Sequence, residues 1–305
     1  MTDIQHERRL LLLVNPMAGK KLAQSKLYEI IDRFVKAGYE VTVHPTQSRG
    51  DATSQVLRKG GQFCRIVCCG GDGTLNEVIT GLAGLKDPPE LGYIPTGTTN
   101  DFAHSLGFSK EPAAAADTAA AGIPFRCDIG RFGERCFTYI AAFGAFTDVA
   151  YTTAQQAKNL FGGLAYLFEG VKRLGSLRSF TVEVSCKKGL IRDEFIFGAV
   201  VNSLSVAGHK GFFSDDVSLN DGEFEVLLVR RPQTIAELNA IIGDLVSQRF
   251  DQQRIRFFKT DDVRFSCSEP LSWTLDGEDG GSVEEVEISC LQNAVTFIVA
   301  PQAAE

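Results

Sequence analysis

The sequence has no hydrophobic stretch long enough to cross a membrane. None of its apolar runs approaches the roughly 20 residues that a spanning helix needs. Residues 1–9 are polar and contain no apolar core of the kind found in signal peptides. We therefore expect a cytoplasmic protein without a transmembrane segment.

The sequence also lacks the spacings typical of metal and disulfide centres. It has eight cysteines but no Cys-x-x-Cys pair, and its four histidines show no ligand spacing. This pattern favours reduced, buried thiols in a cytosolic protein. A Walker P-loop is missing too, so any phosphate site has to be of another kind. The net charge of −7 argues against a general nucleic-acid binder.

The 305 residues suffice for two domains with a sizeable core. Up to residue 122, strand-like and helix-like patterns alternate, as in an α/β domain with a parallel sheet. Strand-like patterns dominate after that point. The sequence therefore predicts an α/β domain at 1–124 and a mostly β domain at 125–293.

Within the second half, the pattern predicts a long helical region over 147–177, interrupted at Gly162-Gly163. Its apolar stripe favours packing on a sheet, and the alternative is contact with an acyl chain or a membrane surface. We expect a strand over 254–267 that Pro270 terminates, and two separate final strands at 284–290 and 294–299.

One stretch, Ile66 to Val78, combines a buried strand, a glycine-rich turn and a helix. Glycines allow a sharp bend and a close approach of a ligand to the backbone. The N–H groups at a helix start favour an anion. Asp72 would repel a bare phosphate, so its presence indicates a mediating cation such as Mg²⁺. The alternative is a structural turn with a surface carboxylate.

A second strand, turn and helix follows at residues 91–103, where Pro95-Thr96-Gly97-Thr98-Thr99-Asn100-Asp101 offers hydroxyl groups to phosphate oxygens. Turns that follow neighbouring parallel strands share one crevice at the carboxyl edge of the sheet. Asn100 and Asp101 could equally cap the helix, which is compatible with a site role.

These two motifs, Gly70-Gly71-Asp72-Gly73-Thr74 and Pro95 to Ala103, resemble the soluble bacterial diacylglycerol kinase family. That family shares its catalytic domain with eukaryotic diacylglycerol, sphingosine and ceramide kinases. The first motif alone is also similar to segments of NAD kinases and phosphofructokinases. The resemblance implies that the first domain is similar to those enzymes, that the second is an antiparallel sandwich, and that the active site lies in the interdomain cleft. It also implies that a final strand, 294–301, returns to the first domain.

The resemblance implies ATP as donor and Mg²⁺ as cofactor, with a nucleotide site on the first domain. Its expected nucleotide-binding residues are Asn15, Pro16, Ala18, Gly19, Thr46, Gly70, Gly71, Asp72, Gly73, Thr74, Asn76, Gly97, Thr98 and Asn100. Ala18 departs from the family, which more often has a hydroxyl residue there. A phosphate-binding lysine could be Lys20 or Lys158.

Two acidic segments of the second half match further family motifs. Ser218, Asp221 and Glu223 resemble a magnesium loop with one carboxylate and backbone carbonyls, although Asn-Asp-Gly is also a good hairpin turn. Asp276-Gly277-Glu278 matches the catalytic acidic motif. Residues two apart on an extended strand face the same side, so we expect Glu278 as the base and Asp276 as its partner, with Asp72 as the third catalytic residue.

The sequence thus predicts a kinase that transfers the γ-phosphoryl group of ATP to a lipid hydroxyl, of which diacylglycerol is the expected acceptor. Alternatives are an NAD kinase-like enzyme with a soluble acceptor and a non-enzymatic lipid or nucleotide sensor. The lipid would be reached at the membrane surface, which implies transient peripheral contact, and a homodimer is possible.

Overall fold

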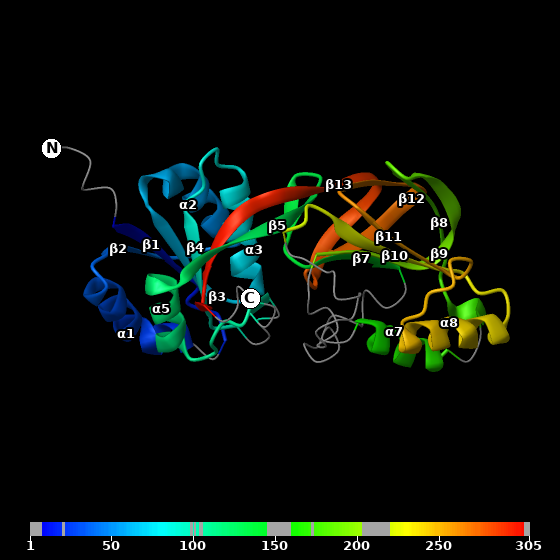
Figure 1. The fold of residues 1–305 in the computed structure, drawn as a ribbon, viewed down its shortest axis with the longest axis horizontal. Helices are drawn as coiled ribbons and strands as arrows, with labels where there is room; N and C mark the ends of the chain where they lie inside the picture. Colours follow the sequence, from blue (N-terminus) through cyan, green and yellow to red (C-terminus); the bar gives the residue numbers. More distant parts are fainter. Residues whose placement is uncertain are drawn as a thin grey trace. The chain divides into compact units, whose positions relative to one another are not determined.

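The chain divides into two compact units, residues 1–127 with 293–305 and residues 128–292. The computed structural model (Figure 1) describes residues 8–19, 22–97, 100, 102–103, 106–144, 160–171, 174–202 and 220–301. The two divisions lie within a few residues of the domain limits expected from sequence. We describe each unit by itself below.

A parallel sheet forms the centre of the first unit, with the strand order β13-β4-β3-β1-β2. The strands are β1 (Arg9–Val14), β2 (Glu40–Pro45), β3 (Arg65–Gly70), β4 (Glu90–Pro95) and the end of β13 (Glu278–Val299). The leucines of β1 and all residues of β3 are buried, as expected for central strands covered on both faces.

Within the described part of this unit, helices α1 (Leu22–Lys36) and α5 (Pro112–Ala121) cover one face of the sheet, and α2 (Asp51–Lys59) and α3 (Asp72–Ala83) cover the other (Figure 1). A short 3₁₀ turn, η1 (Gly60–Gln62), follows α2. Helices α1 and α5 pack on Leu10, Leu12 and Val67 of the sheet. Alanines on α5 allow this close approach, and Glu111 caps its start by accepting a hydrogen bond from the Ala114 N–H group at 2.6 Å.

The second unit is mostly β, with antiparallel pairing between its strands. Its strands are the end of β5 (Ile123–Phe132), β6 (Arg135–Phe137), β7 (Ile140–Gly144), β8 (Phe180–Cys186), β9 (Gly189–Val201), β10 (Phe224–Arg230), β11 (Ile255–Thr260), β12 (Asp262–Leu275) and the start of β13. Because β8 pairs with both β9 and β12, and β7 pairs with the same two strands, the sheet closes on itself. The predicted sandwich is therefore a single folded sheet.

Two hydrophobic clusters lie on opposite faces of this sheet. One, with Phe143, Phe265 and Trp273, fills the space enclosed by the strands. The other lies under helices α7 (Leu160–Glu169) and α8 (Ile235–Ser247), with a 3₁₀ turn, η2 (Leu174–Ser176), beside them. Leu164 and Phe168 of α7 are buried in it, so these residues of the predicted stripe pack on the sheet.

Three local predictions were wrong. Helix α7 continues through Gly162-Gly163 without interruption. Strand β12 continues past Pro270. The register shifts between Ser266 and Leu271, so Pro270 lies outside the regular ladder of hydrogen bonds and is tolerated there. The two expected final strands are one strand, β13, in which Asn293 has a positive φ of 53°.

Candidate active site

The candidate nucleotide site lies at the carboxyl edge of the parallel sheet, where the loops after β1, β3 and β4 meet. Strands β3 and β4 are parallel neighbours, and the Thr96 N–H group donates to the carbonyl of Gly70 at 2.8 Å. The Asn15 N–H group donates to the Cys69 carbonyl at 2.9 Å. Hydrogen bonds between backbones therefore continue beyond the strand ends and bring the three loops together.

The two glycine turns touch through their backbones. A Cβ atom at Gly97 would lie 2.6 Å from the Cα atom of Gly71, and one at Gly71 would lie 3.2 Å from the Cα atom of Gly97. Gly19 has a φ of +55°, and a Cβ there would lie 2.2 Å from the carbonyl oxygen of Thr96. Side chains at these three positions would force the loops apart.

Side chains of predicted nucleotide residues cross-link the same loops. The Asn15 Nδ2 group donates to Thr74 Oγ1 at 2.9 Å, and Asn15 Oδ1 accepts from the Met17 N–H group at 2.9 Å. The Thr46 N–H and hydroxyl groups donate to the Val14 carbonyl at 2.8 and 3.4 Å. The β1, β2 and β3 loops thus form one connected rim.

Asn100 closes the second glycine turn. Its φ is +52° and its side chain is buried. Its Oδ1 accepts from the Gly97 N–H group at 3.0 Å and from Tyr93 Oη at 3.3 Å, and its Nδ2 donates to the Gly97 carbonyl at 2.9 Å. These contacts fix the shape of the second glycine turn.

Asp72 is the first residue of α3, which begins directly after the Gly70-Gly71 turn. The helix therefore starts two residues earlier than the apolar periodicity predicts. The positive end of the helix dipole favours a carboxylate at this position. Asp72 Oδ1 accepts from the Phe102 N–H group at 3.4 Å, so the carboxylate also joins the two glycine turns.

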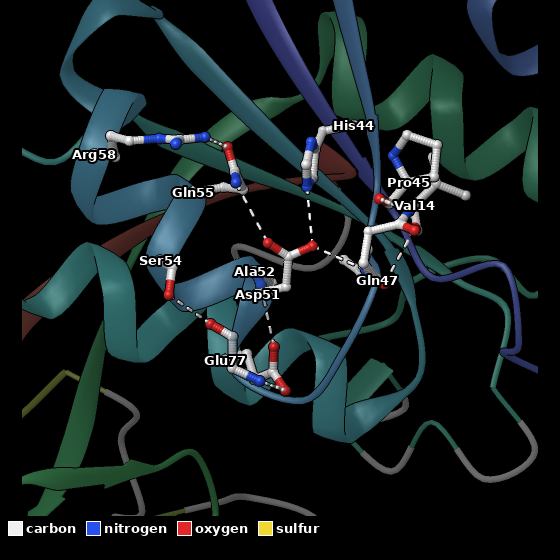
Figure 2. Close-up of polar contacts among 12 residues, drawn as sticks. Val14, His44, Pro45, Gln47, Asp51, Ala52, Ser54, Gln55, Arg58 and Glu77 are labelled. Carbon is white, nitrogen blue, oxygen red and sulfur yellow. Dashed lines mark hydrogen bonds and ion pairs between the residues drawn. The ribbon is translucent and has the colours of Figure 1, made fainter.

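Sequence reasoning missed the residues that shape the loop after β2 (Figure 2). Glu77 of α3 accepts hydrogen bonds from the N–H groups of Gly50 at 2.8 Å and Ala52 at 3.2 Å. Helix α2 has no cap from its own N-cap side chain, so Glu77 caps it from a neighbouring helix. A glutamate in the middle of a helix carries no local signal of such a contact.

Asp51 and His44 hold the other end of this loop (Figure 2). Asp51 Oδ2 accepts from the Gln47 N–H group at 2.8 Å and lies 3.0 Å from His44 Nε2. The hydrogen bond with His44, followed by that from Gln47, lowers the pKa of Asp51. The segment 46–50 is therefore fixed by two carboxylates at the edge of the candidate site.

All eight cysteines are free thiols, as the sequence predicts. Burial raises the pKa of Cys69 to about 12, and that of Cys68 rises well above its ordinary value for the same reason. These two thiols of β3 stay protonated and belong to the core.

The acidic motif of the second unit has a different geometry from the one predicted. Leu275 of β12 pairs with Glu278 of β13, and Asp276 and Gly277 between them have φ values of +50° and +83°. They form a two-residue hairpin turn. Asp276 is buried and Glu278 is exposed, so the two carboxylates do not share one side of an extended strand.

Asp276 is surrounded by hydrogen-bond donors. Its Oδ2 accepts from the N–H group of Thr138 at 2.7 Å and from the hydroxyl of Thr138 at 2.9 Å. Its Oδ1 accepts from the N–H groups of Tyr139 at 3.0 Å and Ile140 at 3.1 Å. Burial raises the pKa of Asp276, and these donors act in the opposite direction.

The predicted magnesium loop forms a tight turn in which Gly222 has a φ of +81°. Asp221 Oδ1 accepts from the Glu223 N–H group at 3.0 Å, and Oδ2 lies 3.3 Å from the ammonium group of Lys259. Lys259 therefore compensates the charge of the Asp221 carboxylate in this structure. A cluster of three or more His, Cys, Asp or Glu residues able to hold a metal does not occur among the described residues.

Several predicted site residues lie outside the described residues. These are Thr98, Ser218, Lys20 and Lys158. The remaining predicted nucleotide residues gather in the first unit, and Asp221, Glu223, Asp276 and Glu278 belong to the second.

Comparison with known proteins identifies the family. Residues 9–132 match the model of the diacylglycerol kinase catalytic domain. The chain is 35% identical over 276 residues to a diacylglycerol kinase of Bacillus subtilis, an alignment that covers 90% of this chain and 91% of the relative. The chain belongs to the bacterial diacylglycerol kinase family.

Other members support this assignment. A diacylglycerol kinase of Staphylococcus saprophyticus is 31% identical over 293 residues, which cover 95% of each chain. The fold matches the crystal structure of a diacylglycerol kinase from Bacillus anthracis with a TM-score of 0.73 and 23% identity, over 97% of this chain and 98% of that one. The family predicted from the two glycine motifs is confirmed over nearly the whole chain.

Proposed function

We propose that this diacylglycerol kinase family member transfers the γ-phosphoryl group of ATP to the hydroxyl of diacylglycerol and so forms phosphatidic acid. The hydroxyl oxygen forms a bond to the γ-phosphorus, the bond to the β–γ bridging oxygen breaks, and ADP leaves. The hydroxyl proton passes to a base. The observation that carries the proposal is the 35% identity to a diacylglycerol kinase over nine-tenths of the chain, together with the paired glycine turns.

The first unit supplies the nucleotide site in this proposal. Gly71 and Gly97 let the two turns pack directly against each other, because a Cβ atom at either position would meet the opposite turn. The N–H groups at the start of α3 favour an anion. Asn15, Thr46 and Thr74 are already held in place by their mutual contacts, so little ordering is needed when ATP binds.

Mg²⁺ bound with ATP would neutralise the charge that develops on the phosphoryl group. Asp72, at the rim of the glycine turns, would hold it. A second cation would bind at Asp221, with carbonyl oxygens of the 218–223 loop. The Asp221 carboxylate lies 3.3 Å from the ammonium group of Lys259, which the cation would have to displace.

The second unit supplies the proton acceptor. Glu278 is exposed at the hairpin between β12 and β13, whereas the Asp276 carboxylate accepts four hydrogen bonds. Glu278 is therefore the better base. The lipid would be met at the membrane surface by a cytoplasmic enzyme. Among the described residues, no helix is long and apolar enough to span a bilayer.

The test is an assay with labelled ATP, Mg²⁺ and mixed micelles that contain diacylglycerol, ceramide or undecaprenol, with NAD as a soluble acceptor. We expect label in phosphatidic acid. Glu278→Ala removes the base and should lower turnover by about 10²–10⁴-fold. Asp72→Ala should also be inactive. Glu284→Ala and Asp87→Ala, which alter exposed carboxylates nearby in sequence, should keep wild-type rates. Transfer to NAD alone, or nucleotide binding without transfer, would refute the proposal.

A further inference from the structure

The Asp276–Gly277 turn is attached to a second segment of the same unit by reciprocal hydrogen bonds. Residues 138–139 connect β6 to β7 and lie beside the turn. The Asp276 N–H group donates to the Ile140 carbonyl at 2.9 Å, while the Asp276 carboxylate accepts from three successive N–H groups, those of residues 138, 139 and 140. The turn cannot rotate without breaking all of these hydrogen bonds at once.

The 138–140 segment is itself fixed from another side. The Asn202 N–H group, at the end of β9, donates to the Tyr139 carbonyl at 2.8 Å, and Asn202 Nδ2 donates to the Asp128 carbonyl at 2.7 Å. The side chains of Thr138 and Asn202 are 3% and 2% exposed. Asp276 is therefore bound to a rigid, water-excluded support, where a lost hydrogen bond is costly.

The chemistry of the support requires a carboxylate. Three N–H groups and one hydroxyl converge on two oxygens, and only a carboxylate presents acceptors on both sides. An asparagine in either orientation would turn its NH₂ group toward at least one N–H donor, that of Thr138 in the more favourable one. Asparagine tolerates positive φ values as well as aspartate does, so the backbone of the turn does not explain the choice of residue.

We infer that Asp276 is a positioning residue, whose buried carboxylate locks the hairpin turn onto residues 138–140 and so fixes the direction in which Glu278 is presented. The inference rests on the proposed function, in which Glu278 accepts the proton. Glu278 directly follows the turn and is exposed, so the way in which the turn is held sets the direction of its backbone. A misplaced base of this kind lowers the rate of the chemical step but leaves nucleotide binding unchanged.

The experiment compares Asp276→Asn, Thr138→Val and Leu245→Ala in the full chain. Leu245 is a buried residue of α8, away from the hairpin in the sequence, and it serves as a control for destabilisation. Each variant is measured for Tm, for kcat and KM with ATP, and for the pH dependence of kcat. Amide hydrogen exchange of residues 138–140 is followed in parallel.

We expect Asp276→Asn to lower kcat by at least tenfold with the KM for ATP within twofold of wild type. Thr138→Val, which removes one of the four donors, should lower kcat less. Leu245→Ala should have a lower Tm than wild type and an unchanged kcat. The acidic limb of the pH profile should persist in Asp276→Asn with a lower plateau, because the base itself is unchanged. Amides 138–140 should exchange faster only in the first two variants.

An unchanged kcat in Asp276→Asn would overturn the inference, and so would loss of the acidic limb, which would make Asp276 the base. If Asp276→Asn does not fold, the inference stands or falls on whether Thr138→Val lowers kcat more than Leu245→Ala does. The amide hydrogen exchange measurement does not depend on catalytic activity. An inactive wild-type protein with normal protection at 138–140 would refute the proposed function, whereas an active one with unprotected amides would refute the positioning role.

Discussion

Asp51 shows how a carboxylate at the edge of the candidate site contributes to stability. Its hydrogen bonds with His44 and Gln47 lower its pKa in the folded state. A lowered pKa means that the stabilisation is present above the unfolded-state pKa, about 3.9, and is lost as the pH falls through the folded-state value. Asp51→Asn should therefore destabilise the protein by about 1–3 kcal/mol at pH 7.

Urea unfolding of Asp51→Asn and wild type at several pH values measures this contribution. The difference in free energy of unfolding should shrink as the pH falls below about 4, because the carboxylate takes up a proton in the unfolded chain before it does so in the folded protein. Asp87→Asn, at an exposed carboxylate, should be neutral throughout. An Asp51→Asn deficit of equal size at pH 3 and pH 7 would contradict the assignment.

At single positions, the sequence predicts the residues whose role follows from backbone sterics. Gly19, Gly71 and Gly97 lie where a Cβ atom would meet another loop, and glycine-rich turns signal such positions directly. Asp276 was predicted to face the same way as Glu278, and this is wrong. Two consecutive residues with positive φ reverse the chain between them, and the period-2 rule holds only along an extended strand.

At the scale of elements, Glu77 joins α3 to the start of α2 and to the loop that carries Thr46. Its two carboxylate oxygens accept from two different N–H groups, at Gly50 and Ala52. Glutamine keeps one acceptor and loses the other, at a cost of about 1–2 kcal/mol. If Thr46 contacts the nucleotide, a looser loop should raise the KM for ATP in Glu77→Gln by about 5–30-fold, with kcat within twofold.

Steady-state kinetics with varied ATP test this, with Ser54→Ala as the matched control. Ser54 donates to the Gly50 carbonyl at the same helix start but is exposed, so its removal should leave both constants unchanged. A Glu77→Gln enzyme with wild-type KM would show that the 46–50 loop does not contribute to nucleotide binding.

Elements were predictable where periodicity and burial agree. The leucines of β1 are all buried, and the buried residues 112, 115, 116 and 119 of α5 repeat at helical spacing, so the bounds of both elements follow. Helix α7 was expected to break at Gly162-Gly163, but a glycine pair weakens a helix only by about 1 kcal/mol per residue. The packing of Leu164 and Phe168 in the core compensates for this weakness, and tertiary contacts of this kind leave no local signature.

At the scale of the whole molecule, the chain passes between the two units twice, within β5 and within β13. The last residues of β13 pair with β4, next to the strand that leads into the first glycine turn. The first unit therefore needs both ends of the chain to complete its sheet. A fragment that ends before residue 293 would lack one strand of the sheet, which sequence periodicity alone does not reveal.

This organisation predicts which segments nucleotide binding will protect from amide hydrogen exchange. With Mg²⁺ and a non-hydrolysable ATP analogue, amide exchange should slow in peptides that cover 12–19, 66–77 and 92–97, whereas peptides of α8 should not change.

Gly97→Val places side-chain atoms where a Cβ would already lie 2.6 Å from Gly71 Cα, so the two turns must separate. This variant should keep the exchange pattern of the unliganded fold and lose the protection by nucleotide. Val246→Ala, at an exposed position on α8, should retain it. Full protection in Gly97→Val would show that the contact between the turns is not part of the nucleotide site.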